Sequence, residues 1–228
     1  MDLYELNPKN LFPQVEDYDY QKAKAHAEKV DQFLGYNIED VEKKIAARFL
    51  SSYRDVNHLS PTQLWINLEP AILQTPYIEI RNMLDSIPQH CAKNKVIDLG
   101  CAYARMAHVV HKHYPNSLFM GFETVLERAQ EAQRVINSLQ MKQTQILCQD
   151  LMAPDFQVPQ ADVFFIYDYG SHEAITKTLN ELKSHATAKS MTVIARGRLS
   201  RHLILKDHAW LSGVNPPLHF QNYSLFFS

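Results

Sequence analysis

The chain has 228 residues, of which 46% are hydrophobic, 21% charged and 11% aromatic, and its formal net charge is −2. Apolar residues sufficient for a core, together with only six glycines, exclude a disordered chain and a fibrous one. The near-neutral charge also argues against a dedicated nucleic-acid binder held by phosphate contacts.

The N-terminal segment is acidic and lacks the apolar run of a signal peptide, and no segment approaches the ~20 apolar residues of a membrane span. The cysteines, Cys91, Cys101 and Cys148, are odd in number and widely spaced. That spacing fits neither a disulfide framework nor a zinc site and favours buried, reduced thiols. We therefore expect a soluble, cytoplasmic protein with no membrane partner. The sequence gives no indication of its oligomeric state.

Two helices are predicted near the N-terminus. Residues 20–34 carry small or apolar side chains at helical spacing, and Gly35 is suited to end that helix. Residues 37–50 repeat the helical spacing. We expect residues 1–69 to form a helical extension or lid that covers the rest of the protein.

Two further helix starts combine a hydroxyl side chain with a proline. Ser60-Pro61 and Thr75-Pro76 both have the sequence of a capping residue followed by proline at the first helical position. They predict a short helix over residues 60–68 and another that begins at Thr75.

The second part of the chain alternates apolar strands with amphipathic helices. The strands are short runs with little polar alternation, at residues 95–99, 117–122, 144–148, 161–167 and 191–195. The helices between them cover residues 104–113, 125–139 and 172–186. Strands that are apolar on both faces indicate a mostly parallel α/β sheet with helices on both faces. Residues 203–205 and 220–227 are predicted as strands with no helix between them, which gives the sheet an antiparallel last strand.

In such a sheet, ligands bind beyond the carboxyl ends of the strands. Gly100 directly follows the first strand, where the chain must turn tightly. Glu123 ends the second strand and is suited to accept the hydroxyl hydrogens of a ribose, or to cap the following helix. Asp150 follows the third strand and is either a ligand contact or an ordinary acid of a surface loop. These residues together predict an adenosine-type site.

Residues 96–105 resemble motif I of class I S-adenosylmethionine-dependent methyltransferases, in which an apolar strand leads into Asp-x-Gly. The resemblance covers roughly residues 70–228, and it implies a methyltransferase domain with a Rossmann-like sheet over that range. It also implies S-adenosylmethionine as cofactor. The family's cofactor-binding positions correspond to Asp98, Gly100, Ala102, Glu123, Asp150 and Leu151. A turn or capping role is the alternative for Asp98.

Within the class, the chain is most similar to the Dot1-like protein lysine methyltransferases. Thr75-Pro76-Tyr77, about 20 residues before the motif, resembles their lead-in segment, which implies that Thr75 folds over the cofactor. The similarity implies a methyl acceptor, first a protein lysine. A small-molecule N- or O-methyltransferase and a non-catalytic binding protein of this fold are the alternatives.

The sequence departs from the family pattern at two places. Ala102 and Ala104 stand where motif I usually has further glycines, and alanine disfavours positive φ. The Asn/Asp-Pro-Pro-Tyr signature of many amino methyltransferases is absent from residues 167–171. Asp168 and Tyr169 nevertheless lie where an acceptor would arrive, so we expect them to be catalytic. Asp168 would take up an amine proton and Tyr169 would stack on a cation, unless both only form the turn after the strand.

Two polar clusters are expected to lie on the surface. Only His108 and His111 share a helix face, and no acid or cysteine nearby completes a metal site with them and His113, so we expect a solvated helix face and no metal. Residues 189–206 contain five basic residues and no acidic residue. This segment is either a solvated edge or a surface for an acidic partner.

Overall fold

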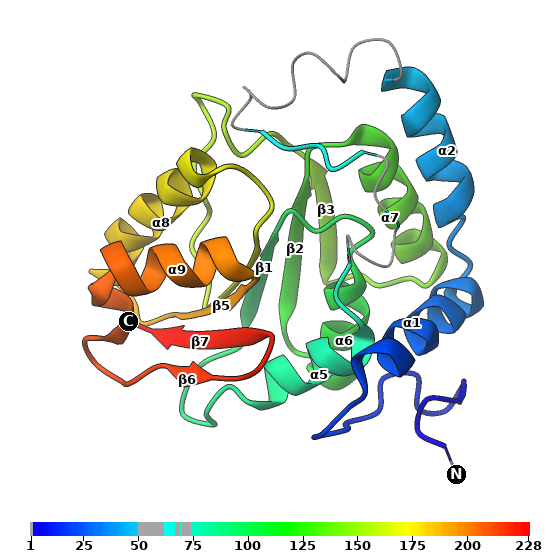
Figure 1. Cartoon of the computed structure of the whole chain (residues 1–228), viewed down its shortest axis with the longest axis horizontal. Coiled ribbons are helices and arrows are strands. Elements are labelled where there is room, and N and C mark those ends of the chain that lie inside the picture. The colour runs from blue at the N-terminus through cyan, green and yellow to red at the C-terminus, as the bar shows by residue number, and fades with distance from the viewer. Residues whose placement is uncertain (1, 50–61, 67–68, 70–73) are drawn as a thin grey trace.

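The computed structural model describes residues 2–49, 62–66, 69 and 74–228. These residues form a seven-stranded sheet in the order β3-β2-β1-β4-β5-β7-β6 (Figure 1). The strands are β1 Lys95–Leu99, β2 Leu118–Glu123, β3 Thr144–Cys148, β4 Val163–Tyr167, β5 Thr192–Arg196, β6 Leu218–His219 and β7 Tyr223–Phe227.

The strand directions follow the sequence pattern. Strands β1 to β5 pair in parallel, whereas β7 lies antiparallel to β5, from Thr192 opposite Phe227 to Arg196 opposite Tyr223. The short β6 extends this antiparallel edge. Central strands such as β4 and β5 are buried because helices cover both of their faces. The predicted Rossmann-like sheet of class I methyltransferases, with its antiparallel last strand, is therefore confirmed.

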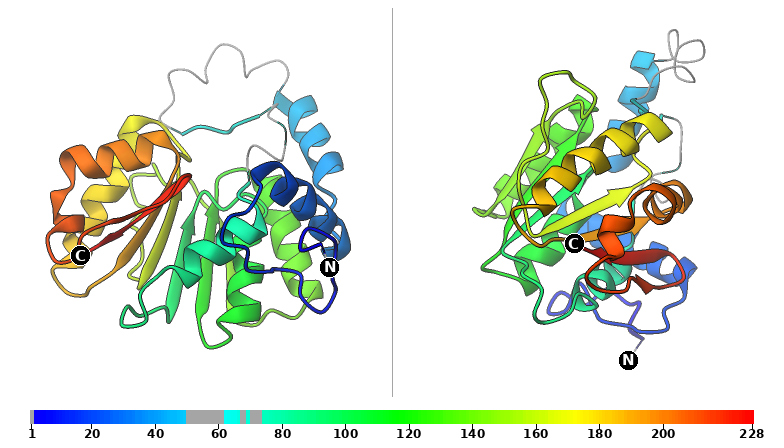
Figure 2. Two further views of the ribbon diagram at one scale, coloured as in Figure 1. Left: turned by 60° about the horizontal axis from the view of Figure 1, so that its bottom comes forward. Right: turned by 90° about the vertical axis from the view of Figure 1, so that its left-hand side faces the viewer.

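Helices cover the two faces of the sheet (Figure 2). They are α1 Tyr20–Leu34, α2 Ile38–Phe49, α5 Tyr77–Asp85, α6 Arg105–His113, α7 Leu126–Ser138, α8 His172–Ala186 and α9 Arg198–Asp207, with a 3-10 turn at Ala209–Ser212. Alternate residues of one strand enter different cores. In β4, Val163 and Phe165 pack with α5, α6 and α7, whereas Phe164 and Ile166 pack with α8 and α9. This period-two pattern is what a strand covered on both faces requires.

Buried ion pairs attach the first helices to the sheet. Asp31 of α1 pairs with Arg105 at the start of α6, and Glu42 of α2 pairs with Arg128 of α7 at 2.7 Å. Breaking such a buried pair is costly because it leaves an uncompensated charge away from water. The N-terminal helices are thus fixed to the same body as the sheet.

Most helix predictions are confirmed, but one strand prediction, residues 203–205, and one helix prediction, residues 60–68, are wrong. Residues 203–205 lie in α9 because Ser200, Leu203 and Ile204 are buried at helical spacing. Residues 60–61 and 67–68 of the helix predicted over 60–68 lie outside the described residues. Its middle, residues 62–66, contains no helix, and Thr62 instead forms an antiparallel bridge with Gly170. The other proline start is confirmed as α5, although Pro76 is its N-cap residue.

Two predictions about which side chains are exposed or buried also need correction. His108 is buried rather than solvated, and its Nε2 lies 2.7 Å from the hydroxyl of Tyr36; burial lowers its pKa to about 3. Among the cysteines, Cys101 is buried as expected, but Cys91 is half-buried and Cys148 is exposed.

The described residues contain no group of three or more side chains placed to hold a metal. Nor does any described helix have the length and apolar character needed to cross a membrane. The basic segment 189–206 is only partly a solvated edge, since Arg196 is buried in an ion pair with Glu79 and Lys189 contacts Asp162.

Candidate functional site

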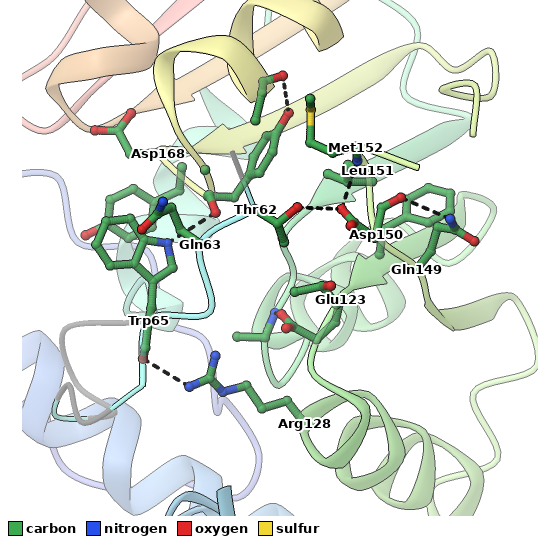
Figure 3. A pocket seen from close by; sticks show the side chains of 18 residues that line it. Thr62, Gln63, Trp65, Glu123, Arg128, Gln149, Asp150, Leu151, Met152 and Asp168 are labelled. Atoms are coloured by element: carbon green, nitrogen blue, oxygen red, sulfur yellow. Dashed lines mark hydrogen bonds between the residues drawn. The ribbon is translucent and has the colours of Figure 1, made fainter. Parts of the chain in front are cut away.

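A cavity of about 260 Å³ lies at the carboxyl ends of β1 to β4 (Figure 3). It contains most of the residues predicted for the site: Gly100, Ala102, Glu123, Asp150, Leu151, Asp168 and Tyr169. The other two, Thr75 and Asp98, line a smaller neighbouring cavity of about 20 Å³. Both cavities border Gly100, Ala102 and Tyr167, so the turn after β1 separates one extended site into two compartments.

The turn after β1 requires glycine at its first position. Gly100 has φ +84°, and its N–H and that of Cys101 both donate to the carbonyl of Phe122, at 3.0 and 2.8 Å. A Cβ at Gly100 would lie 2.4 Å from the Cβ of Tyr169. Both the backbone conformation and the close approach of the loop after β4 therefore exclude a side chain here.

The two alanines of the motif keep the backbone conformation that glycine favours. Ala102 has φ 46° and Ala104 has φ 56°. A left-handed conformation costs an alanine ~1–2 kcal/mol. The cost is offset locally, because the Ala102 N–H donates to Oε2 of Glu123 at 2.9 Å and Ala104 packs in the core. The chain thus keeps the turn of the motif without its later glycines.

Glu123 is buried at the end of β2 and joins two backbone segments. Its Oε2 accepts from Ala102, and its Oε1 accepts the N–H of Val125 at 2.8 Å, just before α7. Burial raises the pKa of Glu123, while the guanidinium of Arg128 opposes that rise. Glu123 is not the N-cap residue of α7: that residue is Val125, and Glu123 accepts the N–H of Val125 rather than one from the first turn of the helix. The same carboxylate lines the larger cavity.

Asp150 and Leu151 form the wall that follows β3. Within the described part of the chain, the Asp150 side chain accepts two hydrogen bonds, both at Oδ1, from the Thr62 hydroxyl and from the Met152 N–H, each at 2.9 Å (Figure 3). Among the same residues Oδ2 has no partner, so it can accept from a donor in the cavity. Leu151 is buried beside it and supplies apolar surface.

The smaller cavity collects buried polar atoms that have no hydrogen-bond partner among the described residues. They are Asp98 Oδ1, Thr75 Oγ1 and both amide atoms of Gln74. Burial, followed by the charge of Glu123, raises the pKa of Asp98 to about 8. Leaving a buried polar atom unpaired costs ~1–3 kcal/mol, so this compartment is suited to a ligand group with both donors and acceptors.

Asp168 and Tyr169 lie after β4, and their polar atoms already have partners. Asp168 has φ 32°, and its two oxygens accept the N–H groups of Leu199 and Ser200 at 3.1 and 2.8 Å, which caps α9. In Figure 3 its carboxylate points away from Glu123 and Asp150. The Tyr169 hydroxyl lies 2.5 Å from Oγ1 of Thr178, and burial raises its pKa.

Several residues of the site were not predicted from the sequence. Gln74 precedes Thr75 in the smaller cavity, and Thr62, Trp65, Arg128 and Tyr167 line the larger one. Tyr167 ends a predicted strand, so its place beside the cavity could have been predicted from the sequence. The others enter through contacts between distant parts of the chain, for which no local sequence signal exists.

No protein-family model matches the sequence, and no curated protein sequence is significantly similar to it. Several solved structures are similar to the chain at low sequence identity. An RNA methyltransferase from Salinibacter ruber in complex with S-adenosyl-L-homocysteine is 13% identical, with a TM-score of 0.46; the match covers 68% of this chain and 91% of that one. An uncharacterised protein from Listeria monocytogenes serotype 4b is 17% identical, with a TM-score of 0.45 and 65% of both chains covered.

The StiE O-MT structure, residues 942–1257, is 13% identical with a TM-score of 0.43, and the match covers 51% of this chain. The chain spans only 41% of the StiE structure and 65% of the Listeria protein. At these similarities, the fold assignment rests on the strand order of the chain itself.

We expect Gly100→Ala to lower the free energy of unfolding by about 2–5 kcal/mol, the sum of left-handed strain and overpacking. Urea denaturation measures this change. Gly213→Ala is the matched control, because a Cβ at Gly213 would come no closer than 3.8 Å to the carbonyl of Ala209. Equal stability of the two variants would contradict the constraint placed on the turn.

We expect Asp98→Asn to stabilise the ligand-free protein, with a gain that grows with pH. The folded state keeps a proton on Asp98 up to a pKa of about 8, whereas the unfolded state releases it near 3.8. The free energy of unfolding of the wild type therefore decreases as the pH rises from about 3.8 to about 8, by at most ~1.4 kcal/mol per pH unit. Denaturation at pH 5 and pH 8 measures the effect, and a pH-independent difference would show that Asp98 ionises normally.

Proposed function

We propose that the protein is an S-adenosylmethionine-dependent methyltransferase. The observation that carries this proposal is the pair of compartments on either side of the Gly100 turn. One presents the buried Asp98 carboxyl together with polar atoms of Thr75 and Gln74 that no described residue contacts by a hydrogen bond. The other has Glu123 and Asp150 on its wall. This set of hydrogen-bonding groups matches a ligand with an amino-acid end and a nucleoside end.

The residues present fit that cofactor. Asp98 would hold its ammonium group, and the Thr75 hydroxyl and Gln74 amide would donate to its carboxylate. Glu123 would accept the ribose hydroxyls through lone pairs that its two backbone hydrogen bonds leave unused, and Asp150 Oδ2 would accept from the adenine amino group. When bound, S-adenosylmethionine supplies an electrophilic methyl group on a sulfonium.

The task of the chain is then to align an acceptor and exclude water. Tyr167 and Tyr169 provide aromatic walls at the end of β4, where both compartments meet. We assign Asp168 the role of a positioning residue, because its oxygens hold α9 in place at this rim. Proton uptake by Asp168 is the competing role.

The acceptor proposed first is a protein lysine. Aromatic faces next to carboxylates suit a cationic side chain, and Tyr167 already stacks on a cation, with the Arg196 guanidinium 4.1 Å from its ring centre. A small-molecule N- or O-acceptor is the alternative. Transfer of labelled methyl groups to a lysate, followed by separation of protein from small molecules, distinguishes the two.

S-adenosylhomocysteine should bind the wild-type protein in an isothermal titration, and Glu123→Gln should weaken binding by about 10- to 150-fold, since loss of a charge-assisted hydrogen bond is worth ~1.5–3 kcal/mol. Glu173→Gln, a change of an exposed glutamate in α8, is the control and should leave affinity unchanged. Absence of wild-type binding at millimolar ligand would refute the proposed function.

The role of Asp168 can be tested by comparing two substitutions. Asp168→Ala removes the cap of α9 and should cost ~1–2 kcal/mol of stability. Asp168→Asn keeps a side-chain acceptor and tolerates the positive φ, so it should retain most of the methyl-transfer rate. If Asp168→Asn instead abolishes transfer while its thermal stability is unchanged, Asp168 is the proton acceptor rather than a positioning residue.

A further inference from the structure

Residues 62–66, which we call the strap, cross the larger cavity and join its two sides. Thr62 pairs with Gly170 after β4, and its hydroxyl donates to Asp150 after β3 at 2.9 Å. Trp65 Nε1 donates to the carbonyl of Tyr169 at 3.2 Å (Figure 3). The strap therefore contacts the loops that follow β3 and β4, two strands that are separated in the sheet by β2 and β1.

Arg128 of α7 holds the strap from the opposite side. Its guanidinium donates to the carbonyls of Leu64 and Trp65 at 2.7 and 3.2 Å, and to both carboxylate oxygens of Glu42. Arg128 is 2% exposed, so these hydrogen bonds are shielded from water. The same charge acts on the Glu123 carboxylate, which lines the cavity below the strap.

Trp65 has a conformation that its surroundings must enforce. Its φ of 48° lies in the left-handed region, which a bulky side chain rarely adopts, and such outliers concentrate at ligand sites. Trp65 lines the cavity, yet 39% of the residue remains exposed, so part of its surface is open to a ligand. Ile66, the next residue, is buried against α2 and anchors the end of the strap.

Three features make the strap a binding surface rather than a simple crossing. It offers an aromatic face with a fixed orientation. Its threonine donates to Oδ1 of Asp150, and no other described residue occupies Oδ2. Arg128 links the strap to the Glu123 side of the same cavity. A flat, apolar ring system with polar edges, such as a purine, is the chemistry that an aromatic face next to carboxylates accommodates.

We propose that Trp65 is a ligand-contacting residue for the nucleoside part of the cofactor, and that Arg128 is the positioning residue that holds it there. This inference rests on the proposed function and deepens it. The contact between Trp65 and the ligand exists only in the complex, and Thr62 and Arg128 hold Trp65 in the orientation that makes it. Loss of this contact is therefore expected mainly in the dissociation rate.

The test measures S-adenosylhomocysteine exchange by stopped flow. Trp65→Leu should raise the dissociation rate about tenfold, equivalent to ~1.4 kcal/mol, while the association rate stays nearly constant. Thr62→Val and Arg128→Lys should change the same rate in the same direction. Arg128→Lys keeps the charge but loses the forked donors that hold two carbonyls. If Arg128 only stabilised the fold, its replacement would not raise the dissociation rate while the association rate stayed constant.

The chain has two tryptophans, so a matched control exists. Trp210→Leu removes the other indole, which lies beside His208 after α9, and should leave both rate constants unchanged. In Trp210→Phe, all tryptophan emission comes from Trp65 and should change saturably with S-adenosylhomocysteine.

The outcomes separate this inference from the proposed function. Wild-type binding with an unresponsive Trp65 emission and an unchanged dissociation rate in Trp65→Leu would overturn the role of the strap, while the methyltransferase proposal would stand. Absence of wild-type binding would overturn both. If Arg128→Lys fails to fold, Thr62→Val and Trp65→Leu still decide, because neither touches the buried pair with Glu42.

Discussion

The left-handed turn after β1 is the constraint on which the site depends. Gly100, Ala102 and Ala104 all have positive φ, so the chain reverses within a few residues and presents successive N–H groups to the end of β2. Since β1 and β2 are parallel neighbours, this reversal brings Asp98 and Glu123 close enough for their charges to interact. A looser connection would separate the two carboxylates and merge the compartments.

Three buried arginines extend this arrangement outward, and each joins an acid of α1, α2 or α5 to a residue of the site. Arg105 binds Asp31 and also donates to the carbonyl of Thr75 at 3.3 Å. Arg128 binds Glu42 and the strap, as described above. Arg196 pairs with Glu79 of α5 and stacks on Tyr167.

The guanidinium group suits this task because its planar fork binds a carboxylate and still has donors for a carbonyl or a face for an aromatic ring. The N-terminal helices therefore do more than cover the sheet: they fix the positions of the residues that border the ligand compartments.

The sequence predicts the parts of this structure that depend on local pattern. Apolar runs identify β1 to β5, and helical spacing identifies α1 and α8 with their observed bounds, because both signals reside within a few consecutive residues. Residues 203–205 were misread because a short apolar run fits a strand or a buried helix equally well. The deciding contact is the cap from Asp168, which lies 31 residues from Leu199.

The strap was misassigned for the same reason. Its conformation follows from a bridge to Gly170 and a hydrogen bond to Tyr169, more than 100 residues away, whereas Ser60-Pro61 indicates only a local helix start. The site residues at strand ends were predictable because topology places them there. Trp65 and Arg128 were not, since their positions depend on hydrogen bonds and an ion pair between distant segments.

The distribution of strain explains why these long-range contacts are needed. Ala102, Ala104, Trp65 and Asp168 all have positive φ, and each borders or adjoins the cavities. Asp98 adds a buried carboxyl with one oxygen unpaired among the described residues. Such features are unfavourable in the free protein and persist only where surrounding contacts over-determine them. The buried arginine pairs and the two cores supply that support, so the cost is concentrated where a cationic, polar ligand would relieve it.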